Sequence, residues 1–236
     1  MASKNRGPQR GGKNNEPDPV TRWIVIGMVS LVVIIGAVFT VVSNKSSSSV
    51  ALPPGASKAD GYGIVFNADA KPRIDIWEDF QCPSCKRFED ANGGKILSLI
   101  NEGKAKVVFH TLSFLGDESV VAGMGGGCAA EQGKFLEYKK FMYTNQQEEH
   151  SGTWTKPYVI SMAGAAGLDE TKFAACLNKD KYRKWLTNVA AAGSDANING
   201  TPTVVIDGNI IESDRDGVNY YTADGFNAQL AKYGIK

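Results

Sequence analysis

Apolar and polar residues are distributed in distinct patterns along the chain, and each pattern predicts a different structure. Residues 1–22 show no apolar periodicity and are rich in Gly, Asn, Pro and charge, which predicts a disordered tail. Residues 23–42 contain no charged residue, and a stretch of this length crosses the hydrocarbon core of a bilayer as a helix. Residues 43–60 hold a run of serines and Pro53-Pro54-Gly55, which is typical of a linker.

The pattern over residues 61–236 predicts one α/β domain. Short apolar runs of strand character lie at 63–65, 73–80, 106–112, 203–206 and 209–211. Asp207-Gly208 separates the last two runs and predicts a hairpin turn. Helical spacing follows the cysteines at 82 and 85, fills about 118–193 and returns at 222–232. The prediction is a sheet interrupted by a helical insertion.

Glycines divide the predicted helices. Gly93-Gly94 predicts a kink or a break, because each glycine costs about 1 kcal/mol relative to alanine in a helix. The cluster from Gly123 to Gly127 predicts a weak helix start and not a phosphate loop, since no strand precedes it closely and no Lys-Ser/Thr follows. A single helix is expected through Cys128, Phe135, Tyr138 and Phe141, and Asp169 is expected to cap a later one.

Charge indicates where the domain resides. The whole chain carries a formal net charge of +1, but the first 45 residues hold an excess of positive charge and the remainder is mildly acidic. Most of the Lys and Arg residues among the first 45 precede the span at 23–42. Positively charged flanks stay on the cytoplasmic side of a membrane, so the amino terminus is predicted to be cytoplasmic and the domain extracytoplasmic. A cleaved signal peptide is the alternative, although no A-x-A-like cleavage site follows the span directly. The domain lacks a basic stripe with interleaved aromatics, which argues against nucleic acid as a partner.

The main candidate for chemistry is Cys82-Pro83-Ser84-Cys85, at a predicted junction between strand and helix. Unpaired N–H groups and the positive end of the helix dipole favour a thiolate on Cys82, and Pro83 suits the first helical position. A thiolate attacks disulfide sulfur, so Cys82 is expected to form a mixed disulfide and Cys85 to resolve it. A static disulfide is one alternative. A zinc site is the other, but only two histidines and no second CxxC are present, so no metal is predicted.

Two further cysteines, Cys128 and Cys176, both fall in the helical block. An even cysteine count in an exported protein favours a structural disulfide between them, and two buried free thiols are the alternative. Thr201-Pro202, just before the strand at 203–206, is a candidate for a cis peptide bond.

Three motifs in this order resemble the DsbA-like branch of the thioredoxin superfamily over residues 62–236. They are Cys-Pro-Ser-Cys-Lys-Arg-Phe from Cys82, Cys-Ala-Ala-Glu-Gln-Gly-Lys-Phe from Cys128, and Asn-Gly-Thr-Pro-Thr-Val-Val-Ile-Asp-Gly from Asn199. The resemblance implies a thioredoxin-like sheet with an inserted helical subdomain and no cofactor. It implies that Cys82 attacks, that Cys85 is its buried partner, and that the backbone at a cis Thr201-Pro202 peptide pairs with an extended substrate chain. The anchor and linker are similar to those of membrane-tethered bacterial members.

The chain departs from this family at two positions. The second residue of the catalytic dipeptide is often His, and here it is Ser84. Many members carry a buried Glu six residues before the first cysteine, and that position is Ile76. Its loss would remove a proton acceptor for Cys85. Glu78 and Asp79 are close by, but strand alternation places them on opposite faces, and the sequence leaves open which of them points inward.

The resulting hypothesis is a membrane-anchored, extracytoplasmic thiol–disulfide oxidoreductase. It would introduce disulfides into reduced, exported polypeptides and be reoxidised by a membrane protein of the DsbB or VKOR type. An extracytoplasmic dithiol without an electron supply tends to stay oxidised, which favours an oxidase. One alternative is an isomerase or reductase on the same scaffold, distinguished by its redox potential. The other is a non-enzymatic, tethered binding or chaperone module whose disulfides are only structural.

Overall fold

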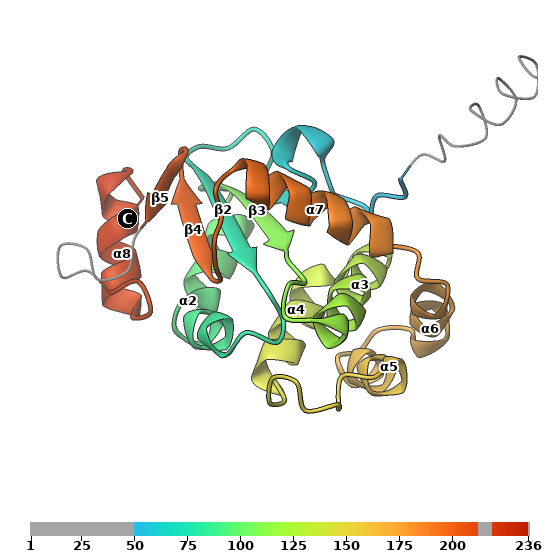
Figure 1. Ribbon diagram of the computed structural model, residues 1–236. Coiled ribbons are helices and arrows are strands. Elements are labelled where there is room, and N and C mark those ends of the chain that lie inside the picture. Colours follow the sequence, from blue (N-terminus) through green and yellow to red (C-terminus); the bar gives the residue numbers. More distant parts are fainter. Residues whose placement is uncertain (1–49, 212–218, 236) are drawn as a thin grey trace, which may run out of the picture. The chain divides into compact units, whose positions relative to one another are not determined.

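Residues 50–211 and 219–235 are described by a computed structural model, and they form a mixed sheet with helices on both faces (Figure 1). The strands are β1 (Ile64–Phe66), β2 (Arg73–Glu78), β3 (Lys106–Thr111), β4 (Thr203–Ile206) and β5 (Asn209–Ile211). The helices are η1 (Lys58–Asp60), α2 (Pro83–Asn101), α3 (Asp117–Glu131), α4 (Phe135–Thr144), α5 (Lys156–Ala165), α6 (Glu170–Asn178), α7 (Arg183–Asp195) and α8 (Ala223–Lys232). The predicted α/β class, with helices α3 to α7 inserted between β3 and β4, is confirmed.

The strand order β1-β3-β2-β4-β5 determines which loops meet. β2 and β3 are parallel, and β4 runs antiparallel to β2. The carboxyl ends of β2 and β3 therefore lie at the same edge of the sheet as the amino end of β4. This edge brings together the chain that leads to Cys82, the loop after Thr111, and Thr201-Pro202.

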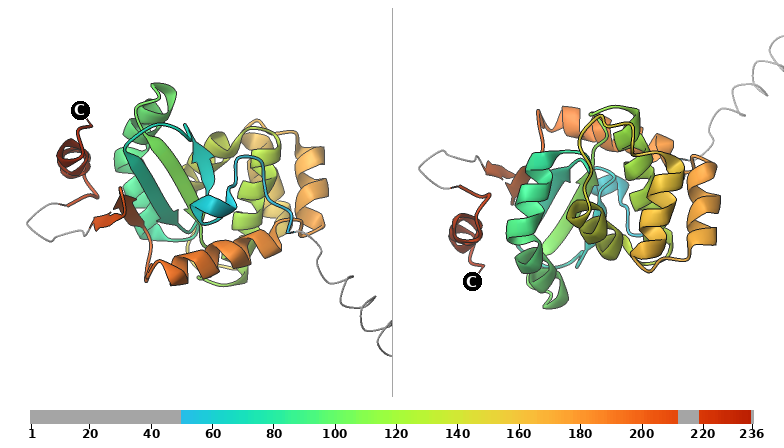
Figure 2. Two further views of the ribbon diagram at one scale, coloured as in Figure 1. Left: turned by 90° about the horizontal axis from the view of Figure 1, so that it is seen from above. Right: turned by 90° about the horizontal axis from the view of Figure 1, so that it is seen from below.

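The central strand β2 is buried on both faces of the sheet. Phe109 on β3 marks the face covered by α2 and α4, because its ring packs 5.6 Å from that of Phe135 on α4. Trp77 points to the opposite face, where its ring stacks on His110 at 3.7 Å and lies against Gly193 of α7. Figure 2 shows α7 crossing one side of the sheet and α2 the other. Burial on both faces explains the nearly continuous apolar run that predicted this strand.

The insertion differs from its prediction at two sets of glycines. The helix expected through Cys128 and Phe141 is two helices, α3 and α4, because the chain turns at Gly133 with φ of +67°. The glycines at 123 and 125–127 do not start a helix but lie in the middle of α3. A Cβ atom on Gly125 would lie 2.3 Å from the Tyr138 hydroxyl, and one on Gly127 would lie 2.6 Å from the Tyr182 ring. These glycines let two bulky aromatic side chains approach the helix backbone.

Helix α2 also corrects an expectation, since it continues without a break through Gly93-Gly94. Its apolar side is buried at Phe88, Ile96 and Leu99, and this burial offsets the low helix propensity of the two glycines. A Cβ on Gly93 would lie 2.5 Å from a carboxylate oxygen of Glu89. Gly93 therefore makes room for the Glu89 side chain along the helix.

Other local predictions are confirmed. The Asp169 side chain accepts a hydrogen bond from the Lys172 N–H at 3.0 Å and caps α6. Asp207 and Gly208 both have positive φ, at 46° and 82°, as the two-residue hairpin between β4 and β5 requires. The structure joins Cys128 on α3 to Cys176 on α6 in a disulfide with an S–S distance of 2.05 Å.

The described part of the chain begins within the predicted linker. Residues from 50 onward belong to the same compact unit as the sheet, and Ala56 forms a β-bridge with Ile64. The predicted tail at 1–22, the predicted span at 23–42 and the first residues of the predicted linker lie outside the described residues. Among the helices of the described residues, none is both long and apolar enough to cross a membrane.

Candidate active site

The two cysteines of the CPSC motif lie at the amino end of α2, just after β2 ends at the edge of the sheet. Cys82 occupies the N-cap position, Pro83 begins the helix, and Cys85 follows one turn later. Both thiols are unbonded. Cys82 is the more accessible, with 8% of its surface exposed against 1% for Cys85. This is the arrangement expected of one attacking and one buried thiol.

The environment shifts the pKa values of the two thiols in opposite directions. The Cys85 thiol, which donates toward Cys82, contributes most to lowering the Cys82 pKa to about 6, and the N–H groups of Cys85 and Ser84 add to this effect against the cost of burial. Burial raises the pKa of Cys85 well above its ordinary value, and the neighbouring Cys82 raises it further. At neutral pH the reduced pair therefore holds its negative charge on Cys82.

A loop from the opposite side of the sheet edge completes the site. The peptide bond Thr201–Pro202 is cis, as expected, and the carbonyl oxygen of Thr201 lies 3.4 Å from the Cys82 sulfur. Tyr220 connects this loop to α2, because its hydroxyl donates to the Pro202 carbonyl at 2.9 Å and its own carbonyl accepts from Asn92 at 2.8 Å. Sequence reasoning missed Tyr220 and Asn92, since their partners lie far away along the chain.

Behind the cysteines, both acidic residues that the sequence left unassigned are buried. Glu78 lies on the same strand face as Ile76, two residues further along β2 and so nearer the cysteines. Its carboxylate forms an ion pair with Lys139 of α4 at 3.2 Å, and Lys139 also pairs with Glu89 of α2. The family's acid is thus absent at position 76, but β2 presents another acid on the same face.

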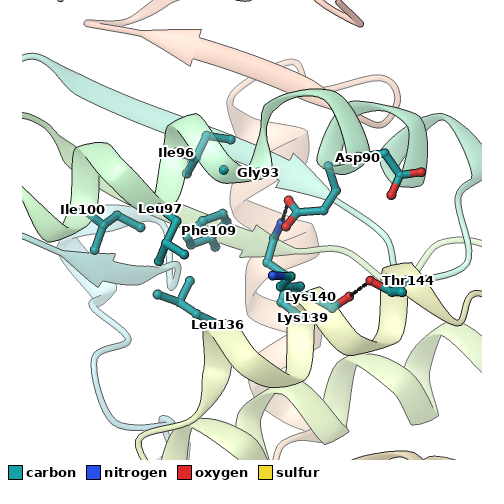
Figure 3. Close-up of a pocket in the computed structure, with 12 residues that line it drawn as sticks. Asp90, Gly93, Ile96, Leu97, Ile100, Phe109, Leu136, Lys139, Lys140 and Thr144 are labelled. Carbon is teal, nitrogen blue, oxygen red and sulfur yellow. Dashed lines mark hydrogen bonds and ion pairs between the residues drawn. The ribbon is translucent and has the colours of Figure 1, made fainter. Parts of the chain in front are cut away.

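The pKa values of this buried charge cluster, Glu78–Lys139–Glu89, follow from burial and pairing. Burial raises the pKa of Glu78 to about 7, although Lys139 opposes the shift. Burial alone would lower the pKa of Lys139, but the two carboxylates hold it above its ordinary value. Lys139 and Glu89 line a pocket of about 310 Å³ between α2 and α4 (Figure 3). The charge of Glu78 is also one of the groups that raise the Cys85 pKa, so the cluster is electrostatically coupled to the cysteine pair.

Asp79 has a different role from Glu78. Its carboxylate accepts hydrogen bonds from the Ser119 hydroxyl at 2.6 Å, the Gln81 N–H at 3.0 Å and the Leu115 N–H at 3.4 Å. Burial nevertheless holds its pKa above the ordinary value. Asp79 therefore fastens the loop after β3 to the chain that leads into Cys82.

The low pKa of Cys82 predicts how the reduced protein reacts with iodoacetamide. The alkylation rate should reach half of its maximum at about pH 6, because only the thiolate reacts. Since the pKa is lower in the folded than in the unfolded chain, the thiolate stabilises the reduced fold above the ordinary thiol pKa. This contribution is lost as the pH falls through about 6. In a Cys82→Ser control, the remaining thiol should react only in strongly alkaline solution. A half-maximum near the ordinary thiol pKa of about 8.5 would contradict the assignment.

Comparison with known proteins places this site in a family. Residues 62–220 match a family model described as thioredoxin. The chain belongs to the thioredoxin family. Among curated protein sequences, none matches it. The family match covers the sheet, the CPSC motif, the whole helical insertion and the cis Thr201–Pro202 peptide.

Solved structures share the fold of this thioredoxin-family chain at low sequence identity. MdbA of Actinomyces oris, a thiol–disulfide oxidoreductase, is 20% identical with a TM-score of 0.65, covering 79% of this chain and 94% of its own. BdbD of Bacillus subtilis is 20% identical with a TM-score of 0.64, covering 78% and 97%. DsbA of Mycobacterium tuberculosis is 22% identical with a TM-score of 0.59, covering 80% and 90%. The DsbA-like fold predicted from the motifs is therefore supported by three separate structures.

Proposed function

We propose that the protein is a thiol–disulfide oxidoreductase of the DsbA type, which transfers its Cys82–Cys85 disulfide to reduced polypeptides. The observation that carries the proposal is the geometry of the pair at the start of α2, where the more accessible Cys82 at the N-cap lies one helical turn from the buried Cys85. The pKa values of the two thiols, shifted in opposite directions, agree with it. A stabilised Cys82 thiolate favours the reduced form of the pair, so the oxidised pair tends to accept electrons. The Thr201 carbonyl beside the Cys82 sulfur offers a backbone partner for an extended substrate.

The reaction follows from this geometry in two exchanges. A substrate thiolate attacks the sulfur of Cys82, the Cys82–Cys85 bond breaks, and Cys85 leaves with the electron pair and takes up a proton. A second substrate thiolate then attacks the substrate sulfur of the mixed disulfide, and Cys82 leaves as the stabilised thiolate. The substrate loses two electrons and gains a disulfide, and the protein gains two electrons and ends in the dithiol form. The low pKa makes Cys82 a good leaving group in the second exchange.

Glu78 is the group best suited to exchange the proton of Cys85. Its pKa of about 7 allows it to carry or release a proton near neutral pH. One of its carboxylate oxygens, Oε1, is buried and lacks a hydrogen-bond partner among the described residues. Glu78 pairs with Lys139, and Lys139 pairs with Glu89. Lys139 and Glu89 line the pocket between α2 and α4.

Replacing Glu78 by glutamine should therefore slow reformation of the Cys82–Cys85 bond from a mixed disulfide about a hundredfold, a typical contribution of a general base. In the wild type this rate should rise as the pH increases through about 7, where Glu78 loses its proton, and the variant should lose that rise. Stopped-flow release of a peptide from Cys82 measures both. Glu89→Gln is the matched control and should retain a rise with pH, moved to lower pH because the Glu89 charge is one of the causes of the raised Glu78 pKa. Equal profiles for wild type and Glu78→Gln would assign the proton transfer to another group.

The equilibrium redox potential of the Cys82–Cys85 pair against glutathione tests the proposed function itself. An oxidase should lie well above thioredoxin, toward the value of about −120 mV for DsbA, whereas about −270 mV would indicate a reductase. The rate at which the oxidised protein forms a disulfide in a reduced two-cysteine peptide completes the test. A native pair that exchanges with neither glutathione nor peptide would support the non-enzymatic binding module.

The same proposal includes a location. We infer that residues 23–42 anchor the chain with the amino terminus in the cytoplasm, so that the substrates are exported polypeptides and a quinone-linked membrane protein of the DsbB or VKOR type removes the electrons. The uncharged length of the span and the excess of Lys and Arg before it support this orientation, as does a disulfide outside the CPSC motif. A reporter fused after Lys236 should be active only outside the cytoplasm. Activity inside would refute the location and leave the redox chemistry testable.

A further inference from the structure

Tyr220 connects two elements that meet at the candidate active site. Its hydroxyl donates to the Pro202 carbonyl at 2.9 Å, and its own carbonyl accepts from the Asn92 side chain of α2 at 2.8 Å. Only 5% of the Tyr220 surface and 1% of the Asn92 surface is exposed, so both bonds are shielded from water. The Tyr220 ring packs edge-on against Phe88 of α2, with the ring centroids 5.8 Å apart. We call these three contacts the Tyr220 brace.

Further contacts fix the segment around Tyr220 to α2. The guanidinium carbon of Arg87 lies 4.1 Å from the centre of the Tyr221 ring, which is a cation–π contact. Phe226 of α8 packs against the same Phe88 ring, with the centroids 5.4 Å apart. Residues on both sides of Tyr220 are therefore held on α2, and the Tyr220 hydroxyl has a defined position relative to the helix that carries the cysteines.

The hydrogen bond between Cys82 and the Thr201 carbonyl cannot hold the loop in place during the reaction. It requires a proton on the Cys82 sulfur, which the thiolate and the oxidised pair both lack. Pro202 has no N–H group, so its carbonyl is the only backbone group through which this residue can form a hydrogen bond. The bond from Tyr220 to that carbonyl does not depend on the redox state of the cysteines. It therefore holds the loop in the oxidised protein, when the Thr201 carbonyl is free to accept from a substrate.

We propose that Tyr220 is a positioning residue, whose hydroxyl keeps the Thr201 carbonyl beside the Cys82 sulfur where an extended substrate chain can pair with it. This inference rests on the proposed function and adds to it a residue near the end of the chain. Tyr220 acts through Pro202 and Thr201. A loop that moves loses part of its backbone pairing with a polypeptide, whereas a small dithiol needs no such pairing.

The Thr201 side chain provides a second readout of the loop position. Its hydroxyl oxygen is buried and lacks a hydrogen-bond partner among the described residues. After the Cys85 thiol, Thr201 is the side chain that contributes most to lowering the Cys82 pKa. A loop released by loss of the Tyr220 hydroxyl carries this donor away from the sulfur, and the Cys82 pKa then rises toward its ordinary value.

The test begins with Tyr220→Phe, which removes the hydroxyl and keeps the ring on Phe88. With the oxidised variant, kcat/KM for a reduced two-cysteine peptide should fall about tenfold through KM, as expected for loss of one buried hydrogen bond. The rate with dithiothreitol should not change. Asn92→Ala should lower kcat/KM for the peptide as well. The double variant should fall little below the lower of the two single variants, because both bonds act along one path. Tyr182→Phe, which loses a hydroxyl bond of 2.6 Å to Glu131 in the helical block, is the matched control and should behave as the wild type.

Alkylation of the reduced protein by iodoacetamide tests the same contact without a substrate. The half-maximum of the rate should lie at higher pH in Tyr220→Phe than in the wild type and in Tyr182→Phe. An unchanged KM or an unchanged half-maximum in Tyr220→Phe would overturn the inference. Equal losses in Tyr182→Phe, or a dithiothreitol rate that falls by the same factor as the peptide rate, would also overturn it. If the wild type oxidises neither peptide nor dithiothreitol, the proposed function fails, and the alkylation profile alone decides the role of Tyr220.

Discussion

A Cys82→Ser/Cys85→Ser double variant should fold as the wild type does and lose thiol–disulfide exchange completely. The hydroxyl of serine cannot form the mixed disulfide, and the remaining two cysteines are joined to each other on α3 and α6. Peptide oxidation by the oxidised protein measures the loss, and thermal unfolding checks the fold. This is the largest effect on activity that we expect from any substitution in the chain.

The single variants separate the roles of the two thiols. Cys85→Ser should accumulate a mixed disulfide with a disulfide-bonded peptide: the Cys82 thiolate attacks the peptide disulfide, one peptide thiolate leaves, and no thiol remains at position 85 to resolve the new bond. The backbone N–H groups of residues 84 and 85 still stabilise the Cys82 thiolate in this variant, although the hydrogen bond from the Cys85 thiol is lost. Cys82→Ser should accumulate none, because Cys85 is buried and its pKa is raised. Residual turnover in the double variant would show that Cys128 and Cys176 take part in exchange.

A Cys128→Ser/Cys176→Ser double variant should lower the free energy of unfolding by up to about 4 kcal/mol. The disulfide closes a loop over a sequence separation of 48 residues, and opening it returns conformational entropy to the unfolded chain. Urea denaturation under non-reducing conditions measures the difference. The potential of the Cys82–Cys85 pair should stay close to that of the wild type, because the bridge lies within the helical block.

In the wild-type protein, the two cysteine pairs should also differ in how easily they are reduced. Mild reductant should expose two thiols per chain with little change in the helical circular dichroism signal, since reducing the CPSC pair gains a stabilised thiolate. Only strong reductant with denaturant should expose all four. If the Cys128→Ser/Cys176→Ser variant instead lost turnover and kept its stability, the bridge would be an electron relay and not a structural link.

Local sequence determined the strands, the hairpin and several helix starts. The run Ile74-Asp75-Ile76-Trp77 predicted β2 because a strand buried on both faces is apolar almost throughout. Asp207-Gly208 predicted its turn because both positions need positive φ, which these residue types tolerate. Asp169 and Pro83 predicted helix starts through bonds and constraints that act within one turn. Each of these signals depends on residues close together in the chain.

Only the tertiary structure decided the role of the glycines. Gly93-Gly94 and the cluster from 123 to 127 have low helix propensity, and a local argument places breaks there. In the fold, Gly125 and Gly127 lie against the rings of Tyr138 and Tyr182, which come from other helices or their caps. The packing of these two rings against α3 stabilises the helix more than the low helix propensity of glycine destabilises it. Both tyrosines lie outside α3, so the sequence of this helix alone does not reveal them.

The sequence likewise predicted only part of the surroundings of the cysteines, and the tertiary structure supplied the rest. The sequence determined the CPSC pair at a helix start and Thr201-Pro202 before a strand, because motif and element are contiguous. It could not determine that Glu78 would pair with Lys139, which follows 61 positions later in the chain. Nor could it determine that the Tyr220 hydroxyl would donate a hydrogen bond to the Pro202 carbonyl. Buried charges and hydroxyls are stable only with a partner, and the fold supplies that partner from a distant segment.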